Sequence, residues 1–133
     1  MVKIEDLTDA ELDVLVAEKV MGWRHIYDKP GKKWLWDTWQ TVQLPDGGSY
    51  SSGCHTICPR FSHDIACAFQ VDKPEWEWLF GERGGDLHIV LCVQAEEDGI
   101  YEVVLPLDPD NKIPAYCRGR CIAALKAYGV EEV

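Results

Sequence analysis

Leu87–Gln94 (LHIVLCVQ) and Ile100–Leu105 (IYEVVL) are two apolar stretches separated by a short segment that contains Glu97, Asp98 and Gly99. Short apolar runs are typical of buried strands, and an acidic segment that ends in glycine is a strong turn signal. The two stretches therefore predict an antiparallel hairpin. Because both strands carry apolar residues on both faces, we expect other elements to pack on each side of their sheet.

A third strand is expected at Trp34–Gln40, where aromatic and β-branched residues favour a pleated surface. We expect it to join the sheet of the hairpin. The sequence PDGG at 45–48 is a turn signal, and Ser49–Pro59 has no clear periodicity, which predicts a loop.

Helical signals come before and after these strands. Thr8 and Glu11 have the spacing of a capping box, which predicts a helix over Asp9–Met21 that Gly22 ends. Ser62 is a favourable N-cap for a second helix.

The second helix is expected to stop at Pro74, which also suits the start of a short helix carrying Trp76 and Trp78. The last helix is expected to run from Pro114 to Gly129. Its buried stripe is predicted to consist of Cys117, Cys121, Ala124, Leu125 and Tyr128.

Length and composition indicate one globular domain over residues 1–133, because 47% of the residues are hydrophobic and 27% are charged. The pattern of elements predicts an α+β fold, in which helices are layered against a small, mostly antiparallel sheet.

Charge and hydropathy argue against several classes of function. The chain has 13 Lys and Arg against 23 Asp and Glu, and a net charge of −10 disfavours nucleic acid as a partner. The acidic start lacks the features of a signal peptide, and the longest apolar run, Ile89–Val93, is too short to cross a membrane. We therefore expect a cytoplasmic protein without membrane contact, whose six cysteines are reduced.

The cysteines and histidines near the middle of the chain have two interpretations. Cys54, His55 and Cys58, with His63 and Cys67 nearby, are the residue types that zinc prefers, but their spacing matches no standard site. The interpretation we favour is that these thiols are idle or buried, so we predict no structural zinc and no cofactor.

Signals of catalysis are missing from the rest of the sequence, which has no GxSxG, HExxH or phosphate-binding loop. Cys117 and Cys121 share a helical face with apolar residues and are expected to belong to the core. His88 is expected to be a hydrogen-bonded histidine within the sheet rather than a catalytic base. No catalytic residue is therefore predicted.

Tryptophan is the most distinctive residue of the chain, with Trp34, Trp36 and Trp39 within six positions. Tryptophan dominates both hydrophobic cores and binding hot spots. Core packing explains most of the cluster, but one member can line a surface, so we identify the three as candidate binding residues. An apolar surface near them also predicts a homodimer.

Three segments resemble a family of small phage proteins, the phage ABA sandwich domain. They are Leu12–Trp23 (LDVLVAEKVMGW), Pro59–Phe69 (PRFSHDIACAF) and Cys121–Ala127 (CIAALKA). The resemblance implies a phage or prophage protein in the cytoplasm of its host, with helices layered on a small sheet, and no assigned activity. The chain departs from the family at 54–58 (CHTIC) and 74–78 (PEWEW).

These observations predict a small phage or prophage accessory protein that acts as a non-enzymatic binding module for a host protein or a small ligand. The alternative is a small enzyme or metal-dependent module that uses the Cys/His loop at 54–67.

Overall fold

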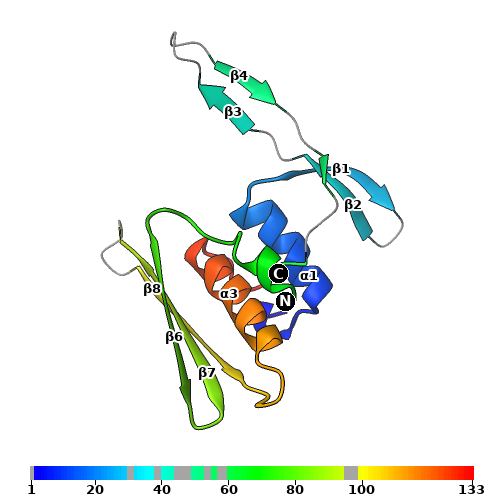
Figure 1. Ribbon diagram of the computed structural model, residues 1–133. Helices are drawn as coiled ribbons and strands as arrows, with labels where there is room; N and C mark the ends of the chain where they lie inside the picture. Colours follow the sequence, from blue (N-terminus) through cyan, green and yellow to red (C-terminus); the bar gives the residue numbers. More distant parts are fainter. Residues whose placement is uncertain are drawn as a thin grey trace.

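The computed structural model describes the backbone of residues 2–29, 32–37, 40–43, 49–52, 55–56, 60–94 and 99–133 (Figure 1). Side chains are described for residues 2–23, 60–94 and 99–133. In these residues no helix is both long and apolar enough to span a membrane.

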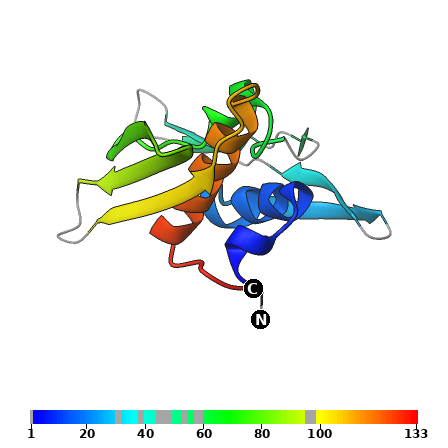
Figure 2. The ribbon, with the colours of Figure 1, turned by 90° about the horizontal axis from the view of Figure 1, so that it is seen from below.

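The core of the protein is an antiparallel sheet with one long helix on one face. The sheet has the order β6 (Trp76–Arg83), β7 (Asp86–Val93) and β8 (Ile100–Pro106). The helix is α3 (Ile113–Ala127), which packs across β7 and β8 and lies between the sheet and α1 (Figures 1 and 2). The fold is α+β, and the predicted hairpin is confirmed as β7 and β8.

The predicted short helix after Pro74 is wrong, because Trp76–Arg83 forms strand β6. Two glycines, Gly84 (φ +60°) and Gly85 (φ +81°), make the two-residue turn to β7. Positive φ at both positions is what a tight hairpin requires. The proline signal was outweighed by the pairing of an aromatic-rich segment with a long neighbouring strand.

The first helix begins as predicted. Thr8 and Glu11 form the capping box of α1 (Asp9–Leu15), after a short turn of 3-10 helix, η1 (Ile4–Asp6). The helix continues as a π-helical segment, η2 (Val16–Val20), and Gly22 follows with φ +69°.

The second helix is shorter than expected and begins later. It is α2 (Ile65–Ala68), and its N-cap is Asp64, whose Oδ1 accepts the backbone N–H of Ala66 at 3.0 Å and of Cys67 at 3.2 Å. Ser62 is therefore not the cap, because its buried hydroxyl donates to the carbonyl of Asp9.

The tryptophan-rich strand does not join the sheet of the hairpin. It is β2 (Lys32–Asp37), which pairs with β1 (Arg24–Lys29) and β5 (His55–Thr56). A separate hairpin consists of β3 (Gln40–Gln43) and β4 (Ser49–Ser52), so the expected loop at 49–59 includes two short strands. Strand β2 pairs with β1, its neighbour in the chain. The side of β7 that β8 leaves open is paired with β6.

One face of the sheet is buried and the other is not. Along β7, Leu87, Ile89 and Leu91 are fully buried, while the residues between them are half-buried. The outward face carries the exposed side chains of Ile100 and Val104. The expectation of packing on both faces is therefore wrong for the residues that the structure describes.

Helix α3 packs on the buried face much as predicted. Cys117, Cys121 and Leu125 are fully buried, whereas Tyr128 is half-exposed and Gly129 ends the helix with φ +77°. Close approach of helix and sheet occurs at Gly119, where an added Cβ would clash with Cδ1 of Ile89.

Candidate functional site

The three tryptophans proposed from the sequence are only partly placed. Trp34 and Trp36 belong to β2, and Trp39 lies outside the described residues, as do the side chains of all three. Their binding role stays a prediction. The same holds for Cys54 and Cys58, which lie outside the described residues, and for His55, described only as backbone of β5.

His63 lies beside a buried carboxylate. Its Nδ1 is 3.2 Å from the hydroxyl oxygen of Ser62 and 3.9 Å from Oδ2 of Asp13. The second oxygen of Asp13 accepts the backbone N–H of Ser62 at 2.8 Å. A serine–histidine–aspartate relay uses both imidazole nitrogens and an accessible serine. Here Nδ1 of His63 faces both Ser62 and Asp13, and Ser62 is buried, which differs from such a relay. The cluster instead joins α1 to the segment before α2.

Burial raises the pKa of Asp13, although hydrogen bonds from the backbone and side chain of Ser62 and the nearby His63 act in the opposite direction. Burial also raises the pKa of the Cys67 thiol. Among the residues that the structure describes, no group of three or more His, Cys, Asp or Glu side chains is placed to hold a metal ion.

The other histidine and cysteines considered in the sequence, His88, Cys117 and Cys121, have structural surroundings. His88 lies on the outward face of the central strand β7, with Nδ1 3.3 Å from Oε1 of Glu102 on β8. Burial raises the pKa of Cys117 to about 11 and that of Cys121 well above its usual value. Thiols with raised pKa values are poor nucleophiles, which agrees with the predicted core role.

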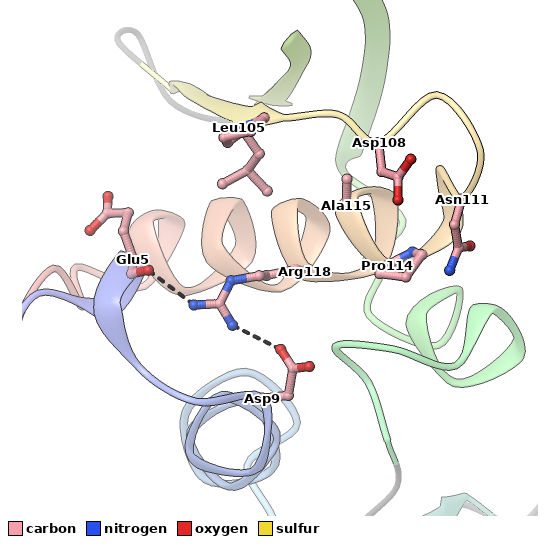
Figure 3. Close-up of a pocket in the computed structure, with 9 residues that line it drawn as sticks. Glu5, Asp9, Leu105, Asp108, Asn111, Pro114, Ala115 and Arg118 are labelled. Atoms are coloured by element: carbon pink, nitrogen blue, oxygen red, sulfur yellow. Dashed lines mark hydrogen bonds and ion pairs between the residues drawn. The ribbon is translucent and has the colours of Figure 1, made fainter. Parts of the chain in front are cut away.

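A cleft of about 430 Å3 opens beside the first half of α3 (Figure 3). Arg118 reaches across it from the helix, and its Nη1 donates to Oδ1 of Asp9 at 2.8 Å. Its Nη2 donates to the carbonyl of Glu5 at 3.0 Å and to the carbonyl of Leu7. The described lining residues are Glu5, Asp9, Leu105, Pro106, Asp108, Asn111, Pro114, Ala115 and Arg118.

The lining of the cleft is acidic. It includes three carboxylates, on Glu5, Asp9 and Asp108, and among the described lining residues the guanidinium of Arg118 is the one cation. Burial raises the pKa of Glu5, but the hydrogen bond and charge of Lys126, a backbone hydrogen bond and the charge of Lys3 together outweigh it and lower the pKa below its ordinary value. Asp9 already pairs with Arg118 and Glu5 with Lys126, so the carboxylate that the cleft offers to a positively charged ligand is chiefly that of Asp108.

A second feature is an aromatic row on β6, formed by Trp76, Trp78 and Phe80 on the face that looks toward α3. Trp76 and Trp78 meet edge to face with ring centroids 5.9 Å apart, and Trp78 and Phe80 stack at 6.2 Å. Such pairs add stability beyond the burial of area.

Side chains of α3 hold the row in place. Tyr116 contacts Phe80 with ring centroids 5.6 Å apart, and Tyr128 contacts Trp76 at 6.0 Å. Between them, the guanidinium carbon of Arg120 lies 4.3 Å from the ring centroid of Trp78.

The row is only partly covered. Phe80 is 42% exposed, and next to it Leu79 on the outward face is 56% exposed. Phe69, whose ring lies 5.3 Å from the guanidinium of Arg120, is 62% exposed. In the part of the chain that the structure describes, β6 pairs with β7 on one side and with no strand on the other, which we call the β6 edge.

Sequence reasoning missed the aromatic row, although a signal for it was present. Aromatic residues at 76, 78 and 80 repeat with a period of two, which is the period of a strand. The proline at 74 led instead to a helical interpretation.

Comparison with protein-family models, with curated proteins and with solved structures gives no match to this chain.

Proposed function

We propose that this protein is a non-enzymatic interaction module, and that the β6 edge with its aromatic row is the surface that contacts a protein partner. The observation that supports this most is an eight-residue edge strand whose central side chains, Leu79 and Phe80, are exposed. Edge strands offer unpaired backbone groups to other chains, and many recognition domains bind an extended segment in this way.

The composition of the strand supports the proposal. Proteins commonly protect an edge with proline or charged side chains; the charges of β6 lie on Glu77, Glu82 and Arg83, and its centre, Trp78–Phe80, has neither proline nor charge. Exposed aromatic and aliphatic side chains beside an open edge supply the apolar contact that gives such pairing its affinity. The resemblance to phage proteins makes a host protein the partner that we propose.

The test compares three immobilised proteins, which are the wild type, Leu79→Lys and Val104→Lys. Val104 is the matched control, because it is 48% exposed on the outward face but lies on β8. A bacterial protein retained by the wild type and by Val104→Lys, and lost with Leu79→Lys, is the expected result. Equal retention by all three, or no retained protein and no ligand in native mass spectrometry, would contradict the proposal.

The cleft beside α3 favours a second candidate function, the binding of a small ligand. Its volume of about 430 Å3 is within the range of small-molecule sites. The carboxylate of Asp108, which lines the cleft, favours an amine or guanidinium. Native mass spectrometry tests this, because a bound cation-bearing molecule should be present on the wild type and lost on Asp108→Asn.

The metal-dependent alternative rests on Cys54, His55 and Cys58, whose side chains lie outside the described residues. Elemental analysis of the purified protein tests it, because a metal site there requires stoichiometric metal that disappears in Cys58→Ser.

A further inference from the structure

We propose that, in the absence of another partner, a second copy of the chain occupies the β6 edge, paired antiparallel about a two-fold axis at Leu79. This inference rests on the proposed function, because it takes the β6 edge as the contact surface and names what covers it. The result would be one continuous sheet of two β6–β7–β8 units.

The backbone of β6 has the alternation that such pairing needs. The N–H of Gln94 donates to the carbonyl of Glu75 at 3.1 Å, which continues the β6–β7 ladder beyond the strand. In an antiparallel pair, successive residues point their backbone groups to opposite sides. The odd-numbered positions 75–83 therefore face β7, and the even-numbered positions 76–82 face the open side.

An axis at Leu79 brings the open positions together. It places Trp78 opposite Phe80 of the partner copy, and Trp76 opposite Glu82. Residues whose backbone groups face away from β7 therefore lie opposite one another in the two copies. The N–H of Trp76 already donates to the carbonyl of Lys73 at 3.1 Å. The remaining groups can form about six hydrogen bonds between the two copies.

Side chains fit the same register. Opposed residues of an antiparallel pair lie on the same face, so the axis pairs Trp78 with Phe80 twice on the inward face and Leu79 with itself on the outward face. It also places Glu75 opposite Arg83, which is a pair of opposite charges. No two like charges oppose each other between positions 75 and 83.

The position of α3 leaves room for this arrangement. The helix packs across β7 and β8, and it reaches the aromatic row through the side chains of Tyr116, Arg120 and Tyr128. In the paired sheet the two aromatic rows would lie side by side, each with its own α3 helix and its own segment before β6, whose Asp72 accepts from Trp78, on the inward face. The second copy would thus cover Phe80 and Leu79, which the single chain leaves exposed.

Disulfide trapping tests both the occupant and the register. In the proposed pair, the two Leu79 positions form a non-hydrogen-bonded pair with Cα atoms about 4.5 Å apart, which a disulfide can bridge. Leu79→Cys, treated with diamide, should give at least about tenfold more linked dimer than the wild-type chain, because disulfides form only at such separations.

Two variants serve as controls. The two Gly81→Cys positions would be separated by about 13 Å along the strands, and Val104→Cys lies on the other edge strand. Both substitutions are tolerated on structural grounds, since Gly81 has no atom within 4 Å of an added Cβ and Val104 is exposed. Neither variant should form more linked dimer than the wild type.

The outcomes separate the inference from the proposed function. A wild-type mass near twice 15.1 kDa in sedimentation, with selective linkage at position 79, supports the inference. A monomer without linkage at 79, or a dimer linked through 104, overturns it. If the monomer nevertheless retains a bacterial protein that Leu79→Lys loses, the proposed function stands and only the second copy is rejected.

Discussion

Arg120 and Trp78 form a cation–π contact, with the guanidinium carbon 4.3 Å from the centroid of the indole ring. Nε of Arg120 also donates to the carbonyl of Val71 at 3.1 Å, and the indole Nε1 of Trp78 donates to Asp72 at 3.0 Å. The arginine is almost fully buried. The two residues thus join α3, the segment before β6 and the aromatic row, so the shape of the β6 surface depends on one buried cation.

Arg120→Ala is expected to destabilise the protein by about 3 kcal/mol, because it removes the cation–π contact and leaves a buried carbonyl without its donor. Arg120→Lys should recover only part of the loss, since an ammonium cannot reproduce the planar fork. Arg60→Ala is the control, because Arg60 is exposed. Urea unfolding followed by circular dichroism measures all three, and equal stability of Arg120→Ala and Arg60→Ala would refute the role of this contact.

Leu125→Ala should cost about 2–5 kcal/mol, because it opens a cavity between α3 and the core. Leu125 is fully buried, whereas Ile113 on the same helix is 49% exposed, and Ile113→Ala provides the matched control. The loss is measured as the shift in the urea midpoint at unchanged slope. A loss below about 1 kcal/mol at Leu125 would show that its face of α3 does not pack on the sheet.

Gly119→Val should destabilise the protein by about 2 kcal/mol or more, since the added side chain meets Cδ1 of Ile89 and lies close to Cδ1 of Leu105. Shortening the neighbour should relieve part of the strain. The double variant Gly119→Val with Ile89→Val is therefore expected to lose less than the sum of the two single losses. Strict additivity would mean that the helix does not approach the sheet at this point.

Asp13 should make the protein less stable as pH rises above about 4. Its folded-state pKa is raised from 3.8, mainly by burial, so the folded chain holds this proton more tightly than the unfolded chain. Stability is then lost as pH increases from the unfolded pKa through the folded one. Asp13→Asn retains an acceptor for Ser62, so it should gain stability relative to the wild type as pH rises from about 4 through the raised folded-state pKa.

Thermal unfolding across this pH range measures the difference. His63 and Asp9 also face Asp13, so the comparison is repeated in His63→Gln. A difference between Asp13→Asn and the wild type that stays constant, or that favours the wild type as pH rises, would contradict the assignment.

The parts of the fold that were predictable from the sequence depend on contacts between near neighbours. The capping box of Thr8 and Glu11 spans three residues, and the β7–β8 hairpin follows from two apolar runs with a turn between them. Partners distant in the chain were not predictable. No feature of Trp34–Gln40 indicates that this segment pairs with β1 rather than with β7.

Most of the candidate site could not be predicted from the sequence, for the same reason. The cleft depends on Arg118 of α3 meeting Asp9 of α1, which are 109 positions apart. The aromatic row had a period-two signal in the sequence, but Pro74 is also compatible with a helix start, and the pairing with β7 decides between the two. Open edges are a property of sheet order, which residue spacing does not encode.

Amide hydrogen exchange of β6 tests the central claim that its open edge is a contact surface. The N–H groups of Trp78, Phe80 and Glu82 point to the open side, while those of Leu79 and Gly81 point to β7 and serve as internal controls. In the wild type we expect all five to exchange slowly, and in Leu79→Lys the first three to exchange at least about tenfold faster while the two controls stay slow. Rapid exchange of Trp78, Phe80 and Glu82 in both proteins, alone and with bacterial lysate, would contradict the account.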